Sequence, residues 1–299
     1  MSMRVDPDLY SVILSGLQTN AQQQDQALQQ VSTGQKLNSL SDNPSAAASL
    51  VHQRMQSGSD TQYLQNITSL TGSLNVADSA ISSVVEALTT AQSVGVEGAN
   101  GTVNAQDRQA MAQQVQGIQQ EIMGLANTAY DGQYLFSGTA TTTQPYAADA
   151  SAPSGVTYNG DNKTNSVEIS EGQAMPINLP GSQLFSSATA SVFQSLQDLY
   201  AALNTNGDVS GATTEVQNAL TYVSSQQTFY GNSVDRLNNA QTFLTQEQMQ
   251  LSETEGSTLD ANMATAVTDL TQTETTQQAL VMVGAKISQV NLFTYLPTQ

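Results

Sequence analysis

The chain has 299 residues, of which 38% are apolar and 5% aromatic, with no Trp and no Cys. Seven Lys and Arg residues stand against 25 Asp and Glu residues, which gives a formal net charge of −18. This negative field disfavours nucleic acids and anionic membrane surfaces as partners, because both are themselves negatively charged. The lack of Cys excludes disulfides, thiolate metal sites, iron–sulfur clusters and thiol nucleophiles.

Apolar runs in the chain are short. The longest run near the N-terminus is Val12–Leu14, which is too short for the core of a Sec signal peptide. The nearest approach to a membrane helix is Leu280–Val283, far below the roughly 18 to 20 apolar residues that a membrane span needs. We therefore expect a soluble chain that, if it leaves the cell, does so without cleavage of a signal peptide.

Residues 9–37 are predicted to form a helix, because every third or fourth residue falls on one side of it. This seam consists of Ile13, Leu17, Asn20, Gln24, Ala27 and Val31. This seam is thin in apolar content, and a buried Leu or Ile stabilises a fold by only about 1.5 to 3 kcal/mol. We expect this end, like the C-terminal end, to be disordered or frayed in the monomer and to fold against other subunits.

A long helix is predicted over residues 45–97, a stretch without Pro. Asn43 can cap its first N–H groups, and Pro44 suits the first helical position because it has no N–H and a helical φ. The seam of this helix is spaced like that of a coiled coil. It consists of Leu64, Ile67, Thr71, Leu74, Ala77, Ile81, Val84, Leu88 and Ala91.

Further helices are predicted over residues 104–129, opened by Asn104 with Asp107 three residues later, and over residues 189–204. Another long seam is expected to end near Gly256 and consists of Val216, Leu220, Val223, Gln227, Tyr230, Val234, Leu237, Gln241, Leu244, Gln248 and Leu251. The sparse C-terminal seam consists of Met263, Ala266, Leu270, Thr273, Gln277, Leu280, Gly284, Ile287, Asn291 and Thr294.

The helical spacing disappears between residues 130 and 185, where Pro is frequent. Residues 156–158 and 167–169 alternate in polarity on either side of Asn159-Gly160, which favours a β-hairpin with a left-handed turn. Residues 134–136 are interpreted as the core strand that opens this region. The predicted fold class is mainly α, with long coiled-coil helices from both halves of the chain and a small β-rich central insertion.

The side chains that could carry catalysis are scattered. His52, the only histidine, lies on a predicted helix with Gln56 where a second metal ligand would stand. Glu253, Glu255 and Asp260 are interpreted as a solvated turn, because no apolar neighbours would raise the pKa of one carboxyl group. We therefore expect no catalytic residue, no cofactor and no metal.

The segment 159–163 has the oxygen-rich composition of a calcium loop, but Lys163 breaks the pattern of alternating ligands, so we interpret it as a turn. An enzyme of the secreted carbohydrate-acting or proteolytic kind is kept as an alternative. It would need paired carboxylates in the middle region. The carboxylates available there are Asp149, Asp161, Glu168 and Glu171.

Several stretches resemble the flagellin superfamily of bacterial flagellar proteins. Residues 28–48, LQQVSTGQKLNSLSDNPSAAA, are similar to the family's N-terminal motif, with Asn43 where the family more often has a second Asp. Residues 125–139, LANTAYDGQYLFSGT, and the ending NLFTYL over residues 291–296 are similar to the subunits of the hook–filament junction rather than to filament flagellins.

The resemblance implies a flagellin-like arrangement in three parts. Residues 1–44 and 259–299 would form paired terminal helices in an inner coiled-coil domain. Residues 45–129 and 186–258 would form a long helical bundle, and residues 130–185 a small β-rich outer domain. The terminal helices would then supply the contacts between subunits, at an assembly seam that consists of Ile13, Leu17, Asn20, Gln24, Val31, Leu270, Gln277, Leu280, Ile287, Asn291 and Leu296.

The resemblance also implies a function and a set of partners. The chain would be a structural subunit of the bacterial flagellum that forms a homo-oligomeric ring, with a FlgK-type hook-associated protein on one side and flagellin on the other. Export would use the flagellum's own type III apparatus and a FlgN-type export chaperone. Filament flagellin itself is the alternative function.

Overall fold

The computed structural model of the chain describes residues 7–39, 41–187 and 190–293, and it describes side chains between residues 11 and 286 of these ranges. Its contacts divide the chain into two compact units, Met1–Gly58 with Glu247–Gln299, and Ser59–Gln246. The first is called the terminal unit and the second the central unit below. Two helices, α2 (Pro44–Gly98) and α6 (Val209–Leu259), contribute residues to both units.

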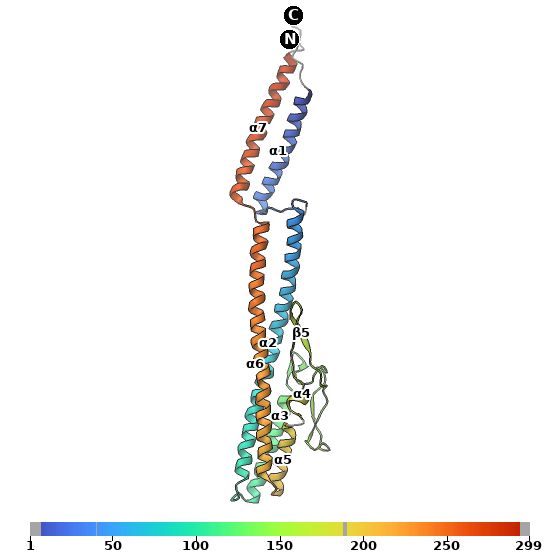
Figure 1. The fold of residues 1–299 in the computed structure, drawn as a ribbon, viewed down its shortest axis with the longest axis vertical. Helices are drawn as coiled ribbons and strands as arrows, with labels where there is room; N and C mark the ends of the chain where they lie inside the picture. Colours follow the sequence, from blue (N-terminus) through green and yellow to red (C-terminus); the bar gives the residue numbers. More distant parts are fainter. Residues whose placement is uncertain (1–6, 40, 188–189, 294–299) are drawn as a thin grey trace. The chain divides into compact units, whose positions relative to one another are not determined.

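The terminal unit contains the two ends of the chain. Helix α1 (Pro7–Thr33) lies beside helix α7 (Met263–Phe293), as Figure 1 shows in blue and red. The first turns of α2 and the last turns of α6 complete the unit. Segments more than two hundred residues apart in the sequence therefore fold against each other here.

The start of α2 confirms the predicted cap. The helix begins at Pro44, and the Oδ1 atom of Asn43 accepts a hydrogen bond of 3.1 Å from the N–H of Ala46. The cap satisfies a backbone donor that has no partner within the helix. The predicted helix end near Gly256 is wrong, because α6 passes through Gly256 and continues to Leu259. A Gly inside a helix lowers its stability by only about 1 kcal/mol, which neighbouring turns can offset.

The central unit is a bundle built from α2, α3 (Ala105–Ala126), α5 (Val192–Thr205) and α6. Asn104 caps α3 through a 2.8 Å bond from the N–H of Asp107, as expected. The predicted seams face the common core of these helices. Its buried seam residues are Ile67, Leu74, Ala77, Ile81, Val84, Leu88, Ala91, Val216, Val223, Tyr230, Leu237 and Leu244.

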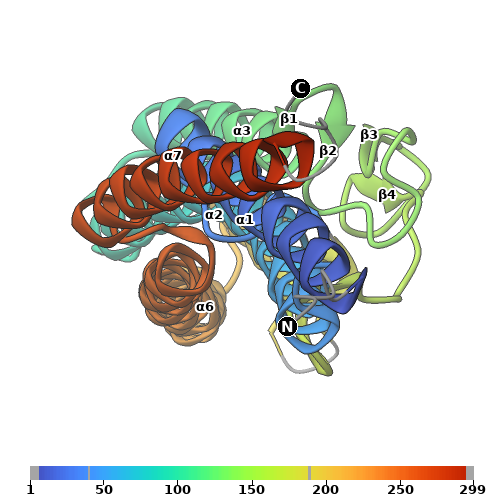
Figure 2. The same cartoon turned by 90° about the horizontal axis from the view of Figure 1, so that it is seen from above.

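The middle region folds as three two-stranded antiparallel hairpins followed by the short helix α4 (Gly181–Leu184). Figures 1 and 2 both place the hairpins on one side of the helices of the central unit. The strands are β1 (Ala129–Tyr130), β2 (Gln133–Tyr134), β3 (Tyr146–Ala148), β4 (Val156–Tyr158), β5 (Ser166–Ser170) and β6 (Gln173–Pro176). Because the hairpins and the bundle share one compact unit, the boundary of an outer domain stays a prediction.

The strand pairing differs from the predicted hairpin. β4 pairs with the earlier strand β3, and β5 pairs with the later strand β6. Gly155, with φ +73°, and Gly172, with φ +68°, lie in the turns of these two hairpins, whereas Asn159-Gly160 links them. The prediction was wrong because alternation identifies a strand but not its partner.

The predicted core strand 134–136 is also shorter than expected. Tyr134 ends β2, while Phe136 lies beyond the strand and is fully buried. Its ring packs edge-on against Phe185 at 5.4 Å between ring centroids. Tyr146 joins this cluster, donates a 2.8 Å hydrogen bond to the carbonyl oxygen of Gly181, and has a hydroxyl pKa that burial raises well above its ordinary value.

The motif Ser137-Gly138-Thr139 is held by Asp161. The Oδ1 atom of Asp161 accepts a 2.7 Å bond from the N–H of Thr139, and the Thr139 hydroxyl donates to the Oδ2 atom. These bonds hold the pKa of the Asp161 carboxyl below its ordinary value. Gly138 has φ +73°, and a Cβ atom there would collide with the backbone carbonyl of Asp161. The turn at residues 159–163 therefore serves to tie two segments of the middle region together.

Replacing Gly138 with Ala should destabilise the central unit more than replacing Gly132 with Ala. Both glycines have positive φ, which costs an L residue roughly 1 to 2 kcal/mol, but only Gly138 has atoms within 4 Å of the added Cβ. The collision should add about 1 to 3 kcal/mol. Urea unfolding of the two variants measures the difference, and equal free energies of unfolding would show that the close approach to Asp161 has no energetic weight.

Candidate assembly interface

The predicted seams of the two terminal helices face each other within one chain. On α1, every predicted seam residue is buried or partly buried, and the same holds on α7 as far as Gly284, apart from Met263. The members of the predicted assembly seam that are buried or partly buried are Ile13, Leu17, Asn20, Gln24, Val31, Leu270, Gln277 and Leu280. Ile287 and Asn291 belong to α7, but their side chains lie outside the described set, and Leu296 lies outside the described residues.

One polar seam residue makes a specific contact across this helix pair. Asn20 is only 5% exposed, and its Nδ2 atom donates a 2.9 Å hydrogen bond to the backbone carbonyl oxygen of Thr273. Sliding α1 by one turn would break this bond and bury the amide without a partner, which costs about 1 to 3 kcal/mol. A single buried Asn in a seam fixes the register of other coiled coils in the same way.

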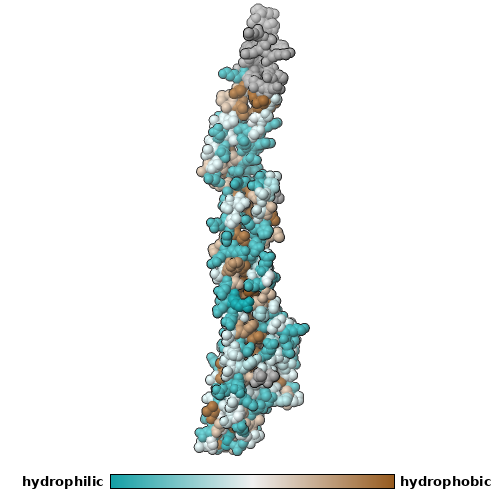
Figure 3. Space-filling model, in the orientation of Figure 1, coloured by the Kyte–Doolittle hydropathy of each residue, from teal (hydrophilic) through white to brown (hydrophobic). Residues whose placement is uncertain are grey.

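Both terminal helices carry exposed apolar side chains outside the seam. Each is at least 44% exposed, and Met282, at 65%, is the most exposed of them. They are Val12, Leu14, Leu28, Val267, Val281, Met282 and Val283, which we call the outward apolar residues. Figure 3 shows brown apolar atoms among teal polar ones on one face of the molecule. An apolar surface on helices that already pack together is typical of a site for further protein contacts.

The segment between α1 and α2 is tied to the segment between α6 and α7. Gly34, with φ +71°, ends α1, and its carbonyl oxygen accepts a 2.9 Å bond from the N–H of Ala261. The N–H of Lys36 donates a 2.5 Å bond to the carbonyl oxygen of Leu259. Asp42 folds the first segment by accepting bonds from the N–H groups of Asn38 and Ser39. The motif of residues 28–48 thus builds a joint inside the terminal unit.

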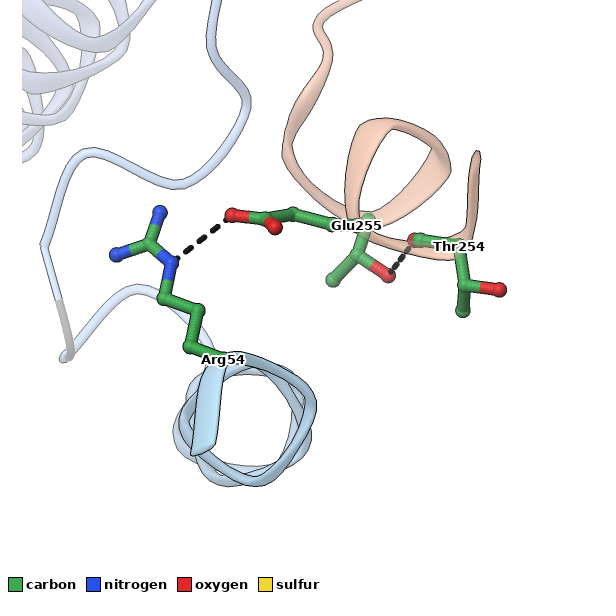
Figure 4. Close-up of polar contacts among 4 residues, drawn as sticks. Arg54, Thr254 and Glu255 are labelled. Atoms are coloured by element: carbon green, nitrogen blue, oxygen red, sulfur yellow. Dashed lines mark hydrogen bonds and ion pairs between the residues drawn. The ribbon is translucent and has the colours of Figure 1, made fainter. Parts of the chain in front are cut away.

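An ion pair links α2 to α6 in the same unit. The Nε atom of Arg54 lies 2.9 Å from the Oε1 atom of Glu255, and the two side chains are 60% and 30% exposed (Figure 4). Exposed pairs of this kind contribute at most about 1 kcal/mol. Glu255 therefore belongs to a helix–helix contact, in place of the solvated turn expected for it. His52 lies exposed on α2, as predicted for a helix-face imidazole.

Three of the four carboxylates considered for an enzyme accept hydrogen bonds in turns and loops. Asp149 accepts bonds from the N–H and hydroxyl of Ser151, and Glu168 accepts a 2.8 Å bond from the N–H of Gly172. The carboxylate of Asp161 accepts hydrogen bonds from the N–H and hydroxyl of Thr139. Among the described residues, no group of three or more His, Cys, Asp or Glu side chains could hold a metal ion.

In the described ranges, none of the helices combines the length and the apolar character that crossing a bilayer requires.

Sequence analysis missed the outward apolar residues. The heptad spacing identifies one face of a helix, and these residues fall between the seam positions. The available signal was the run Val281–Val283, because three consecutive apolar residues cover more than one face of a helix. The cross-segment bonds of the joint left no such signal, since they involve backbone groups.

The chain matches two models of protein families. Residues 9–141 match the bacterial flagellin N-terminal helical region, and residues 213–296 match the bacterial flagellin C-terminal helical region. Flagellar hook-associated protein 3 of Salmonella typhimurium is 32% identical over 275 residues, which cover 87% of this chain and 83% of that protein. Flagellin B of Helicobacter pylori is 26% identical over 141 residues, which cover 46% of this chain and 27% of that protein.

A solved structure shows the same fold. The putative flagellar hook-associated protein from Vibrio parahaemolyticus has a TM-score of 0.66 and 22% sequence identity. The match covers 73% of this chain and 100% of that protein. This likeness confirms the predicted fold class of long helices around a small region of strands.

Replacing Asn20 with Leu should loosen the register of α1 on α7 without weakening the pair. The variant exchanges a buried amide for an apolar side chain, while the Thr273 carbonyl keeps its helical bond. Spin labels on cysteines placed at the exposed positions Gln22 and Thr275 report the register as a distance distribution. The distribution should broaden in Asn20→Leu.

The control is Gln24→Leu. Gln24 is also a seam residue, but its side chain makes no hydrogen bond across the helix pair among the described residues. Its distance distribution should stay as narrow as that of the parent protein. A narrow distribution in Asn20→Leu as well would mean that apolar packing alone sets the register.

Proposed function

The chain belongs to the family of the bacterial flagellins and flagellar hook-associated protein 3, and from this membership we propose that it is the structural adapter between hook and filament. The relative named hook-associated protein 3 matches over most of both proteins, whereas the flagellin match covers less than half of this one. That difference favours the junction over the alternative of a filament flagellin.

The observation that carries the proposal is the pair of faces on the terminal helices. One face is used inside the molecule, where α1 and α7 pack together and Asn20 sets their register. The other face carries the outward apolar residues, which are exposed among the described residues. A subunit with this design has its own fold complete and keeps a second apolar surface for its neighbours.

The predicted assembly seam takes a narrower role in this proposal. Its described residues hold α1 to α7, so they would prepare the surface that binds neighbouring subunits and would not themselves form it. Direct contacts between subunits would come from the outward apolar residues. Ile287, Asn291 and Leu296 continue the C-terminal end of this region and stay predicted members of the interface.

The proposed partners follow from the position of a junction. A homo-oligomeric ring of this protein would contact a FlgK-type hook-associated protein on one side and flagellin on the other. Export would run through the flagellar type III apparatus without cleavage of a signal peptide, with a FlgN-type chaperone bound to the C-terminal segment. The apolar run Val281–Val283 supports a need for such a chaperone, because it would be exposed before assembly.

The proposal excludes an enzyme. Asp149, Asp161 and Glu168 accept hydrogen bonds in turns and loops, and hydrogen bonds from Ser151 and Thr139 lower the pKa values of Asp149 and Asp161. A general acid needs the opposite shift, because it must hold its proton near neutral pH. The function would then lie in the helix surfaces.

Deleting the gene in its host tests the junction function. Bare hooks, with flagellin released as monomers into the medium, are the expected result, because flagellin is made and exported but finds no adapter. Electron microscopy of hook tips and an immunoblot for flagellin measure the two parts of this result. Bare hooks with no filament protein in the medium would identify the protein as the filament flagellin, and intact filaments would exclude both functions.

Replacing Met282 with Asp should block incorporation into the flagellum and leave the monomer folded. The Met282 side chain is 65% exposed, so the monomer tolerates an Asp carboxylate at this position. Burying that carboxylate between subunits would cost several kcal/mol. Motility and the presence of filaments in a complemented deletion strain measure the effect. The matched control is Thr275→Asp on the same helix, which adds the same charge at an exposed polar position and should support filaments.

A further inference from the structure

Three Asn-Gly pairs occur in the sequence, at Asn100-Gly101, Asn159-Gly160 and Asn206-Gly207. An Asn side chain followed by Gly can be attacked by the next backbone nitrogen, because Gly places no Cβ in the way of ring closure. The reaction needs a backbone N–H that is free to turn toward the Asn amide. The three pairs differ in the hydrogen bonds and packing that hold the Gly residue.

The first pair lies in the exposed connection between α2 and α3. The Oδ1 atom of Asn100 accepts a 3.2 Å bond from the N–H of Thr102 and a 3.0 Å bond from the Thr102 hydroxyl. The N–H of Gly101 takes part in no hydrogen bond among the described residues, and no atom lies within 4 Å of where its Cβ would be. The backbone nitrogen of Gly101 is thus free to attack, while Thr102 holds the side-chain carbonyl of Asn100 that it would attack.

We propose that Asn100 is a site of spontaneous deamidation, promoted by Thr102. The Gly101 nitrogen forms a bond to Cγ of Asn100, and the bond between Cγ and Nδ2 of Asn100 breaks. The leaving amine takes up the proton of the attacking amide and departs as ammonia. Water then opens the resulting five-membered succinimide ring and leaves aspartate or isoaspartate at position 100.

The two donors of Thr102 fit the charge that develops during the attack. When the amide nitrogen adds to Cγ, negative charge collects on Oδ1 of Asn100. Hydrogen-bond donors already aimed at that atom stabilise the intermediate, as in the oxyanion holes of enzymes that transfer acyl groups. The Thr102 hydroxyl and N–H occupy this position in the α2–α3 connection.

The other two pairs are held against the reaction. The N–H of Gly207 donates a 2.9 Å bond to the carbonyl oxygen of Ala202, at the end of α5, so it must break a hydrogen bond before it can attack. Gly160 is packed under the ring of Tyr158, and the Ser137 carbonyl oxygen would lie 2.8 Å from a Cβ at this position. Ring closure there requires the surrounding turn to open.

Deamidation would act on the end of α2. The helix ends at Gly98, and the N–H of Asn100 donates a 3.1 Å bond to the carbonyl oxygen of Glu97. A new carboxylate near this end meets the negative pole of the helix and the Glu97 carboxylate, which is unfavourable. Isoaspartate also adds a methylene to the main chain and would disturb the turn toward α3.

Incubating the purified full-length protein at mildly alkaline pH and mapping its peptides by mass spectrometry tests the site. Asn100 should convert first, with both aspartate and isoaspartate as products. Asn206 should convert at least about threefold more slowly, since one backbone hydrogen bond protects its neighbour. Conversion of Asn159 or Asn206 as fast as Asn100 would overturn the proposal.

The variant Thr102→Val isolates the role of the hydroxyl, because Val keeps the shape of Thr and the backbone N–H. Conversion of Asn100 should slow roughly two- to tenfold, the range expected for loss of one exposed hydrogen bond. The rates at Asn159 and Asn206, measured in the same sample, are the internal controls. An unchanged or faster rate at Asn100 would show that Thr102 does not promote the reaction.

Discussion

Helices as long as α2, with 55 residues, and α6, with 51, can be held only by a narrow stripe of side chains along each of them. Such a stripe gives affinity between helices but little resistance to sliding, because one apolar residue replaces another when a helix moves by a turn. The rest of the structure depends on how this ambiguity is resolved. In both units a polar residue on the stripe resolves it.

Each unit has a polar side chain of this kind on its stripe. In the central unit, the Nε2 atom of Gln227 donates a 2.8 Å bond to the hydroxyl oxygen of Ser82, across α6 and α2. In the terminal unit, Asn20 does the same for α1 and α7 with a backbone carbonyl. Gln241, by contrast, lies exposed although it falls on the predicted stripe, so a polar residue at a heptad position does not by itself imply a contact.

The helices could be predicted from sequence because their signals are local. Asn43, Asn104 and the spacing of apolar residues place helix starts and buried faces correctly. The hairpins could not, since β3 and β4 are each three residues long and any of several short segments could have paired with them. Within the candidate assembly interface, the seam between α1 and α7 was predictable from spacing. The exposed apolar residues could be identified only once it was known which side of each helix the other helix covers.

The excess of acidic over basic residues has a consequence for the medium in which the protein works. The ion pair of Arg54 with Glu255 lies at the surface of this acidic protein, where the Arg54 side chain is 60% exposed. Added salt would therefore remove little attraction, yet it would screen the mutual repulsion of 25 acidic residues against seven basic ones. Contacts between copies of such a protein gain from rising ionic strength, so a structure built from them tolerates brackish or saline surroundings better than very dilute ones.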